Sequence, residues 1–506
     1  MADTVALMRK RVLDMAIRGE LVDQRKEDGT ADQLYNSIQI EKGRLIESGK
    51  FKKNKALSEI EEAEMPFDIP DNWKWVKLND LSSLITDGAH KTPTYVDEGV
   101  PFLSIKNISQ GYLNISDIKY ISQEEHEELI KRCHPEKGDI LFCRIGTLGR
   151  AHLIENDFDF SIFVSVGLVK IINKKMGKYL KYMMDSPEFY RQLNEVKVVG
   201  SHASKLNLRD VRNMLIPLPP ISEQERIVAK IEEIFAVIDQ IGKRKVEALR
   251  IIQNMRQTAL QDAIRGVLVE QDETDEPAFE LLKKIKKNKE RLIDIGERKK
   301  ATNVEKISKE DLPFEIPEDW EWARVNELVE INLGFTYRPQ YQETGKLFLS
   351  VKDLADSGIN LNNAKYISND EFEEASYGSK PKRGDLLFGR VGTLGKPRIV
   401  DFDEEFCIFV SLGFFRTYDV DNIKMEYLSY WMESNLFWMQ VSENVKGSAQ
   451  QNLNTGWLKN FIIPFPPLFE QERIVAKLDK IMAICDQMEV ILDGTSEANE
   501  PLKVAE

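Results

Sequence analysis

The histidines and cysteines in the first half of the chain are the residues whose types suggest metal chemistry most directly. His126, Cys133, His134 and Cys143 lie close together in the sequence. Imidazole and thiolate are the ligands that zinc prefers. However, these residues contain no C-x-x-C pair, and the related segment in the second half of the chain carries Gly389 where the first carries Cys143. We therefore expect no metal site on this chain.

Motifs for nucleotide binding and catalysis are also missing from the sequence. The glycine-rich segments IGTLGR (145–150) and VGTLGKP (391–397) lack the G-x-x-x-x-G-K-[ST] spacing that surrounds a phosphate. No G-x-G-x-x-G follows a predicted strand, and no N/D-P-P-Y/F tetrapeptide of an amino-methyltransferase occurs. All five histidines lie in the first half, and no nucleophile–base–acid set is repeated. We expect no catalytic centre and no cofactor on this chain.

The elements that must position any functional residue come from a duplication. MPFDIPDNWKWVKLNDL at 65–81 returns as LPFEIPEDWEWARVNEL at 312–328. The octapeptide EQERIVAK occurs at 223–230 and again at 470–477. Two copies of one fold therefore lie in this chain.

The duplication is circularly permuted. MRKRVLDMAIRGELV at 8–22 matches MRQTALQDAIRGVLV at 255–269, which follows the first EQERIVAK. The second EQERIVAK, in contrast, lies close to the C-terminus. The two ends of the chain together thus rebuild its central element, which implies a pseudo-twofold arrangement with adjacent termini.

The central element is predicted to be one long helix over about 222–264. Ser222 and Glu225 form an S-x-x-E capping box, and Gly266 is suited to the position after the last turn. Apolar residues recur with heptad-like spacing at Ile227, Ile231, Ile234, Ile238, Ile241, Val246, Leu249, Ile252, Met255, Ala259 and Ala263. We expect two long antiparallel helices, one continuous and the other split between the chain termini.

The segments between the helices alternate short β-rich runs, such as DILFCRIG and FSIFVSVGLVKI, with turn signals and helical patches. The fold class is therefore α+β, with two α/β globular domains separated by two long antiparallel helices. We divide the chain into an N-terminal helix (1–22), a connector (23–64), a first domain (65–221), the central helix (222–266), a second connector (267–311), a second domain (312–468), a C-terminal helix (469–494) and a tail (495–506).

Charge, apolar runs and cysteine spacing exclude several classes of protein. The 506 residues carry a net charge of −14, which excludes nucleic-acid binding by bulk charge alone. No apolar run reaches the roughly 20 residues that a membrane helix needs, the N-terminus has no signal-peptide core, and the four cysteines show no disulfide framework. We expect a soluble protein of the reducing cytoplasm.

Comparing the two copies separates a framework from variable loops. The segments 86–93 and 332–339 keep a glycine and a proline, and 200–207 and 447–454 keep a glycine, a leucine and an asparagine, while the polar residues between them are exchanged. Those exchanged residues include His, Lys, Arg, Gln and Thr, which are types that contact base edges and phosphates. Two reading surfaces for two different targets would show this pattern. Surface loops that vary without any ligand would show it as well.

The motifs carry a family resemblance over nearly the whole chain. The IPDNW-type domain entry, the loop TDGAHKTP, the run GDILFCRIGTLG and the twice-occurring G…LN…IPLPPISEQERIV segment closely resemble the specificity subunits of type I DNA restriction–modification systems. The resemblance includes the circular duplication. The second copy departs from the first in carrying Phe469 at the place of Ser222, and Thr336 and Tyr337 at the place of His90 and Lys91.

The resemblance implies a function and partners. Each globular domain would be a target-recognition domain that reads one half of a bipartite, asymmetric site in double-stranded DNA. The long helices would set the spacing and dock methyltransferase subunits, two per chain, with motor-nuclease restriction subunits in the full bacterial or archaeal complex. S-adenosylmethionine, ATP and magnesium would then belong to those partners. The rival hypotheses are a non-catalytic adaptor that binds proteins without reading DNA, and a fused enzyme with unrecognised motifs.

We expect DNA contacts from the two variable loops and from the R-[IV]-G-T-L-G turns. In the first half the candidates are Thr86, Asp87, His90, Lys91, Thr92, Lys106, Asn107, Arg144, Thr147, Ser201, His202, Ser204 and Lys205. In the second half they are Thr336, Tyr337, Arg338, Lys352, Arg390, Thr393, Lys396, Ser448, Gln450, Gln451 and Asn454. Because Arg144 and Arg390 do not change between the copies, a phosphate contact or a structural role is favoured for them over base reading.

Overall fold

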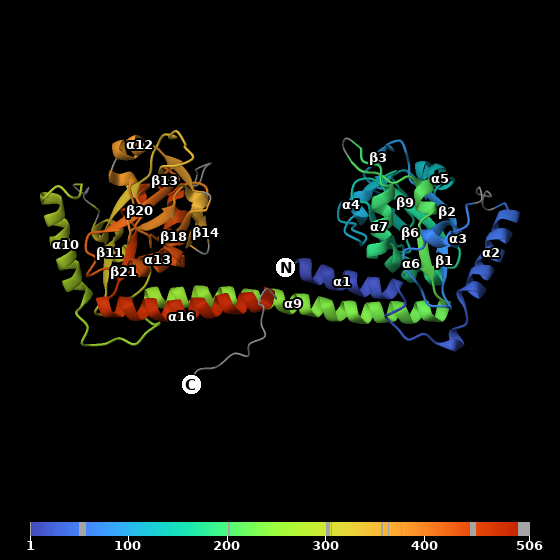
Figure 1. Ribbon diagram of the computed structural model, residues 1–506, viewed down its shortest axis with the longest axis horizontal. Coiled ribbons are helices and arrows are strands. Elements are labelled where there is room, and N and C mark those ends of the chain that lie inside the picture. The colour runs from blue at the N-terminus through green and yellow to red at the C-terminus, as the bar shows by residue number, and fades with distance from the viewer. Residues whose placement is uncertain are drawn as a thin grey trace. The chain divides into compact units, whose positions relative to one another are not determined.

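The computed structural model describes residues 2–49, 57–200, 203–299, 304, 306–355, 358–362, 364–375, 377–445 and 452–493. The chain forms two compact units, Met1–Arg244 and Lys245–Glu506 (Figure 1). Each unit contains one globular α/β domain and a pair of packed helices. No helix in the described part of the chain is both long and apolar enough to cross a membrane.

The elements of the first unit follow the order of the predicted repeat. Its helices are α1 (Ala2–Ile17), α2 (Ala31–Glu47), α3 (Leu78–Leu81), α4 (Ile105–Ile108), α5 (Gln123–Ile130), α6 (Gly177–Met184), α7 (Pro187–Val196), α8 (Leu208–Arg212) and the first part of α9 (Ile221–Arg265). Its strands are β1 (Lys74–Lys77), β2 (Ser82–Asp87), β3 (Tyr95–Val96), β4 (Val100–Leu103), β5 (Lys119–Ile121), β6 (Ile140–Cys143), β7 (Gly149–Leu153), β8 (Ser161–Ile162), β9 (Val166–Ile171) and β10 (Leu215–Leu218).

The second unit follows a similar order after the remainder of α9, with the strands β14 and β15 where the first unit has α4. Its helices are α10 (Ala278–Asp294), α11 (Val325–Leu328), α12 (Asn369–Glu374), α13 (Met425–Glu433), α14 (Asn435–Val445), α15 (Thr455–Leu458) and α16 (Leu468–Asp493). Its strands are β11 (Glu321–Arg324), β12 (Val329–Leu333), β13 (Lys346–Leu349), β14 (Leu354–Ala355), β15 (Gly358–Ile359), β16 (Lys365–Ile367), β17 (Leu386–Gly389), β18 (Gly395–Ile399), β19 (Phe406–Ile408), β20 (Leu412–Thr417) and β21 (Ile462–Phe465).

A four-stranded antiparallel sheet lies at the centre of each domain, ordered β2-β9-β6-β7 in the first and β12-β20-β17-β18 in the second. Successive residues of β6 alternate between two hydrophobic clusters. Ile140 and Phe142 pack in one cluster, and Leu141 and Cys143 pack in the other. Because both faces of the strand are covered, the segment is a continuous apolar run rather than an alternating one.

Each domain contains two further sheets of the same kind, and the second domain also contains the two-stranded sheet of β14 and β15. A small sheet next to the main one contains a parallel pair, β4 with β8 and β13 with β19. The first and last strands of each domain form a two-stranded sheet, β1 with β10 and β11 with β21. The side-chain amide of Gln192 bonds both the N–H and the carbonyl of Leu215, and Gln440 does the same to Ile462. A glutamine side chain thus satisfies the main-chain N–H and carbonyl of one residue at the start of the last strand in each domain.

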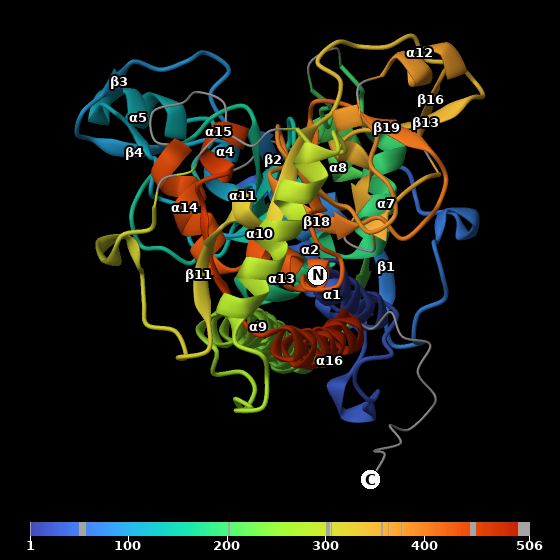
Figure 2. The same cartoon turned by 90° about the vertical axis from the view of Figure 1, so that its left-hand side faces the viewer.

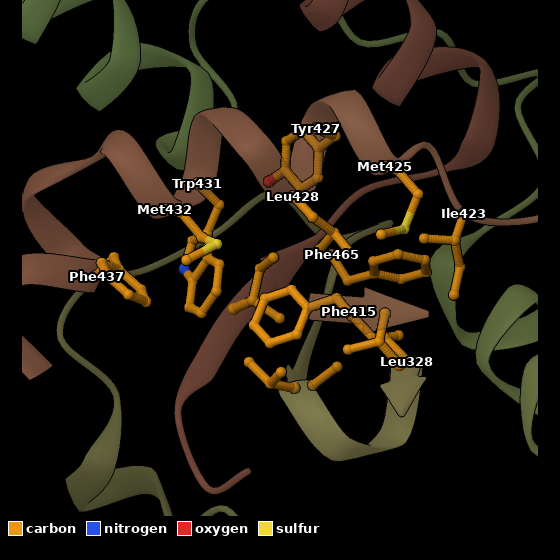
Figure 3. Close-up of a cluster of buried hydrophobic side chains, with 14 of the residues drawn as sticks. Leu328, Phe415, Ile423, Met425, Tyr427, Leu428, Trp431, Met432, Phe437 and Phe465 are labelled. Atoms are coloured by element: carbon orange, nitrogen blue, oxygen red, sulfur yellow. The ribbon is translucent and has the colours of Figure 1, made fainter. Parts of the chain in front are cut away.

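The core of the second unit is formed between α13 and the strands below it (Figure 3). Tyr427 and Trp431 of α13 pack with Phe415 of β20 and Phe465 of β21 in one buried cluster. The hydroxyl of Tyr427 donates to the carbonyl of Pro464 at 2.7 Å, so the buried phenol keeps a partner.

The long helices pair as the permuted repeat predicts. In the first unit α1 runs antiparallel to α9, and Arg9 of α1 forms an ion pair with Asp239 of α9 (Figure 1). In the second unit α16 runs antiparallel to α9 (Figure 1) and lies beside it (Figure 2), and Arg256 of α9 pairs with Asp486 of α16. The second ion pair is the first one displaced by 247 positions in the sequence. The predicted fold class is confirmed.

The predicted apolar seam of α9 is wrong in its middle. Ile241, Val246 and Met255 are 47%, 58% and 41% exposed. Seven-residue steps from the buried Ile238 instead lead to Lys245 and then to the buried Ile252. The charged group of Lys245 lies 3.1 Å from the carboxylate of Asp493 in α16. The heptad therefore continues through Lys245, a charged residue that a search for apolar residues does not find.

Gly242 lies on the side of α9 that faces α1. A β carbon at Gly242 would lie 3.5 Å from Cγ2 of Val5, which is an ordinary van der Waals distance. Ile241, which is 47% exposed, is therefore not the residue that faces α1. A hydrophobicity pattern does not detect a glycine at a helix contact.

The predicted capping box at the start of α9 is also wrong. The helix begins at Ile221, so Ser222 lies within the first turn, and its hydroxyl donates to the carboxylate of Asp28 at 2.8 Å. The side-chain amide of Gln224 donates to the carbonyl of Pro219 and stabilises the entry to the helix. Phe469, the counterpart of Ser222, is exposed, and no capping residue is lost in the second copy.

A glycine and a tryptophan join the helices to the base of each domain. Gly266 ends α9 with φ 73°, as predicted, and the N–H of Val267 donates to the carbonyl of Asp262 at 3.0 Å, which is the Schellman arrangement. A β carbon on Gly266 would lie 2.5 Å from Cγ of Pro317 and 3.1 Å from the Trp320 indole. Gly19 ends α1 with φ 75° in the same way.

The same tryptophan contacts the start of the next helix. The indole N–H of Trp320 donates to Oε2 of Glu470, near the first residue of α16, at 2.8 Å. The side chain of Gln271 donates to the other carboxylate oxygen at 2.6 Å. Burial raises the pKa of Glu470, and these two hydrogen bonds act in the opposite direction. Trp320 therefore contacts the end of α9 and the beginning of α16 together.

The two connectors each contain a helix that packs on its domain. Ala31 and Ile38 of α2 are buried, and so are Leu281 and Ile285 of α10. The charge-rich sequence is confined to the other faces of these helices, as expected for an amphipathic surface helix.

We expect Gly266→Ala to lower the free energy of unfolding by more than about 2 kcal/mol, because the left-handed backbone alone costs roughly 1–2 kcal/mol with a β carbon and the added carbon meets Pro317. Gly19→Ala should behave alike. Gly43→Ala in α2, where a β carbon meets nothing within 4 Å, should stabilise by about 0.5–1 kcal/mol. Urea unfolding measures all three, and a wild-type midpoint for Gly266→Ala contradicts this account.

Candidate DNA-binding surfaces

The polar residues after β2 converge on one buried carboxylate in the first unit. Asp87 is 2% exposed, and its Oδ1 lies 3.1 Å from Nε2 of His90 and 3.2 Å from Nη1 of Arg132. Its Oδ2 lies 3.1 Å from Nη1 of Arg144. A buried carboxylate is tolerated when cations and donors surround it. These four residues, which we call the Asp87 cluster, fix the first variable loop against the R-I-G-T-L-G turn.

The second variable loop of this unit docks on the same turn. Val198 and Lys205 exchange two main-chain hydrogen bonds of 2.9 Å across the base of the loop. The N–H of Gly146 donates to the carbonyl of Ser204 at 2.9 Å, and the N–H of Leu206 donates to the carbonyl of Arg144 at 3.0 Å. The structure thus brings together both variable loops and the invariant turn, which are distant in the sequence.

The second unit has the same main-chain framework. The N–H of Arg390 donates to the carbonyl of Ser411 at 2.8 Å, and the N–H of Leu453 donates to the carbonyl of Arg390 at 3.0 Å. At the start of the first loop, the N–H of Phe335 donates to the carbonyl of Ile408 at 2.8 Å. The main chain therefore holds the invariant turn and the described ends of the loops in an equivalent way in both units.

The side chains on this framework differ between the units. Leu333, Thr336 and Gly378 stand where the Asp87 cluster has its aspartate, its histidine and Arg132. The first loop of the second unit instead carries an aromatic pair, since the rings of Phe335 and Tyr337 stack with centroids 5.1 Å apart and an interplanar angle of 12°. The first loop thus carries a charged cluster in one domain and a stacked aromatic pair in the other.

The loops and turns present polar side chains to solvent. The exposed candidates are His90, Lys91, Thr92, Lys106, Thr147, Lys205, Thr336, Tyr337, Arg338, Lys352 and Thr393. The side chains of the five lysines and arginines among them make no hydrogen bond or ion pair with any other described residue. Their donors remain available for phosphates or for acceptors on base edges.

Within the described part of the chain, no group of three His, Cys, Asp or Glu side chains could hold a metal ion. Burial raises the pKa of Cys133, Cys143 and Cys407 to about 12, so these thiols are protonated at neutral pH. A protonated thiol is neither a good nucleophile nor a metal ligand. His126 is buried against the hydroxyl of Ser161 at 2.9 Å.

The sequence of each unit matches the same protein family. The sequence model of that family, described as "Type I restriction modification DNA specificity domain", matches residues 70–250 and again residues 317–491. The chain belongs to this family. The two matches cover all the strands of both globular domains and most of the helix that follows each of them.

Known specificity subunits resemble the chain over its length. The EcoAI specificity subunit of Escherichia coli is 27% identical over 96% of this chain and 90% of its own length. The EcoEI specificity subunit of Escherichia coli is 25% identical over 97% and 91%. A chain in a solved structure of a type I restriction–modification system covers 85% of this chain and 95% of its own at 21% identity, with a TM-score of 0.61, and so shares the fold.

The protein is therefore a DNA specificity subunit with two target-recognition domains and is not a catalytic subunit. The family predicted from the motifs is confirmed, and so is the role in DNA recognition. The comparisons do not favour the adaptor hypothesis. Which side chains contact the DNA stays a prediction.

Several predicted contact residues of this specificity subunit are used inside the domains. Asp87 and Arg144 pair with each other. Asn107 is 5% exposed and bonds the main chain of residues 104, 114 and 117. Asn454 caps α15 by accepting from the N–H of Gly456 at 2.7 Å. These four are placed to support the loops, which does not by itself test a DNA contact.

The remaining candidates divide by position. Thr86 is buried in β2. Ser204 and Lys396 are half-buried, and Lys396 has a positive φ of 49°. The candidates Ser201, His202, Ser448, Gln450 and Gln451 lie outside the described residues.

Arg132 is the member of the Asp87 cluster that sequence reasoning missed. It lies just after α5, 45 positions from Asp87, and no local motif links the two. The two copies do hold a signal, because the aspartate, His90 and Arg132 are all replaced together in the second copy. Joint replacement of residues that are far apart in sequence indicates contact in space.

We expect Asp87→Asn to lower the free energy of unfolding by about 1–3 kcal/mol, because the neutral amide leaves the partly buried Arg144 without its counter-charge. Leu333→Asn, at the same strand position in the second domain, should change stability by less. Differential scanning calorimetry of the whole chain measures both. Equal melting temperatures for the Asp87→Asn variant and the wild type would show that the cluster does not stabilise the domain.

Proposed function

We propose that each globular domain reads one half of an asymmetric, bipartite DNA site through the tips of its two variable loops. The observation that carries this proposal is the contrast between a shared main-chain framework and different loop side chains. Asp87, His90 and Lys91 in the first domain correspond to Leu333, Thr336 and Tyr337 in the second. Two domains with one backbone and different donors and acceptors are suited to two different base sequences.

The chemistry of the loops favours different readers in the two domains. Lys91 and Lys205 in the first domain can donate to guanine acceptors or phosphates, and Thr147 can donate and accept. In the second domain Arg338 can form a bidentate contact with guanine, and the exposed ring of Tyr337 can contact a thymine methyl group. The candidates outside the described residues, including Gln450 and Gln451, remain part of this proposal.

The charge balance supports a division of labour with partner subunits. Residues 65–220 contain 20 Lys+Arg and 20 Asp+Glu, and residues 312–467 contain 15 and 23. Neither domain has the positive excess that drives tight, sequence-independent binding. We infer that this chain supplies base reading and that its partners supply much of the affinity for the DNA backbone.

The partners that we propose are methyltransferase subunits, two per chain, and restriction subunits in the complete complex. The exposed apolar residues Val237 and Ile241 on α9 and Ile484 and Ile491 on α16 support a docking role for the long helices. S-adenosylmethionine, ATP and magnesium would be bound by those subunits. We expect the assembly to work in the cytoplasm, where it meets cellular DNA.

The test is to co-express the chain with the methyltransferase subunit that we expect to be encoded beside it and to map methylated adenines across the genome by single-molecule sequencing. We expect one bipartite, non-palindromic motif. In the same assay Lys91→Ala should relax or weaken only one half of the motif and Arg338→Ala only the other, because a lost base contact costs ~1–3 kcal/mol at one position.

Lys137→Ala serves as the matched control, because Lys137 is exposed and pairs with Asp157 away from the loops; its motif should be unchanged. Methylation that persists unchanged when this chain is omitted would contradict sequence reading and would return the adaptor hypothesis to first place.

The continuous helix α9 also predicts how the spacing of the two half-sites is set. Four residues inserted after Gly242 lengthen the helix by ~6 Å, which is about two base-pair rises of 3.4 Å. We expect the unread gap in the methylated motif to grow by about one or two base pairs. Intact methylation with an unchanged gap would exclude a role for α9 in setting the distance.

A further inference from the structure

Equivalent arginines lie at equivalent places in the two domains. Nη1 of Arg144 donates to the carbonyl of Val164 at 3.3 Å, and Nη1 of Arg390 donates to the carbonyl of Val410 at 3.2 Å. In the second domain Nε of Arg390 also donates to the carbonyl of Leu453 at 3.0 Å. Main-chain atoms of the shared framework therefore place both guanidinium groups.

The two arginines differ in their counter-charge. Asp87 lies at the end of β2 opposite Gly167 and pairs with Arg144. Leu333 lies at the end of β12 opposite Gly413, in the same register, and offers no charge. The second domain thus keeps the arginine but has lost the carboxylate that neutralises it in the first.

No described residue of the second unit replaces that carboxylate. Arg390 forms no ion pair with a described residue, and its hydrogen bonds to described residues go to main-chain carbonyls alone. Residues 446–451, which precede the segment containing Leu453, contain no Asp or Glu in the sequence. Partial burial disfavours the charged guanidinium and lowers its pKa. A partly buried cation without a counter-ion favours the arrival of an anion.

We propose that Arg390 binds a backbone phosphate of the DNA at the second domain, whereas Arg144 is neutralised internally by Asp87 and does not. This inference rests on the proposed function in that it takes DNA as the ligand. A phosphate is favoured over a base edge because the guanidinium is positioned by the framework that both domains share, not by the loops that differ. The two half-sites are therefore held by unequal phosphate contacts.

The test measures how DNA binding depends on salt for the whole chain in complex with its methyltransferase subunits. The probes are a duplex with the methylated motif and a random duplex of equal length. Binding to each is measured in KCl at about 50 to 300 mM, a range in which the affinity of proteins for DNA falls steeply with salt. Leu333→Asp restores the missing carboxylate beside Arg390. We expect it to lower the slope of log K against log [KCl] by about one on both duplexes, and to weaken binding about tenfold near 0.1 M KCl.

Three variants make the result specific. Leu333→Asn, the neutral control, should keep the wild-type slope. Arg390→Gln should lower the slope as much as Leu333→Asp, and the double variant should lower it no further, because both changes remove one contact. Asp87→Asn should act in the opposite direction and raise the slope, because it frees Arg144.

The outcomes distinguish failure of the Arg390 phosphate contact from failure of the proposed sequence reading. Equal slopes for Leu333→Asp and Leu333→Asn overturn the phosphate contact, and so does a loss of affinity confined to one base pair of the motif, which would make Arg390 a base reader. A wild-type complex that binds both duplexes equally overturns the proposed sequence reading. The slope on the random duplex still tests Arg390 in that case, because a phosphate contact does not depend on sequence.

Discussion

The contact between the base of each domain and the ends of two long helices is the constraint on which the rest of each unit depends. Trp320 lies against the glycine that ends α9 and donates to the buried Glu470 in the first turn of α16. In the first unit Trp73 lies against Gly19 in the same way, and the neighbouring Asn72 donates to Glu223 at the start of α9 at 3.2 Å. Because the tryptophan belongs to the base of the domain, it holds domain and helices together as one unit.

Above that base, each domain separates support from reading. Main-chain hydrogen bonds hold the loops and the invariant turn in the same way in both units, although the loop side chains differ. The exposed lysines and arginines among the candidates, such as Lys91 and Arg338, make no hydrogen bond or ion pair with another described residue. This separation allows two domains with one fold to recognise different sequences, and it fits a chain whose net charge of −14 gives little help in attracting DNA.

Much of this architecture could be predicted because the sequence contains two copies of the same repeat. The matching segments of the two copies predicted the two domains and the split helix, and Gly266 predicted where α9 ends. The middle of the seam could not be predicted, because hydrophobicity favours Ile241 and Val246, whereas Gly242 and Lys245 hold the positions that face the partner helices. The capping interpretation failed for a related reason, since Ser222 bonds Asp28, a residue 194 positions away. Contacts set by tertiary structure leave no local pattern.

The candidate site shows the same limit. Residue types identified the loops, but they did not distinguish side chains that face solvent from those that the fold uses, such as Asn107 in its turn or Asn454 at its helix cap. Arg132 carries no local signal at all. Only the comparison of the two copies holds the information, and the structure was needed to show which substitutions belong together.

The Asp87 cluster also limits how such a domain can evolve. A single change from aspartate to leucine would leave Arg132 and Arg144 together without their shared counter-charge, and loss of the arginines first would leave a buried carboxylate unpaired. Either intermediate is less stable than the states before and after it. New recognition loops of this kind are therefore reached more readily by replacing the interacting segments together than by successive point mutations, so the same contacts that hold the loop in place also slow its gradual change.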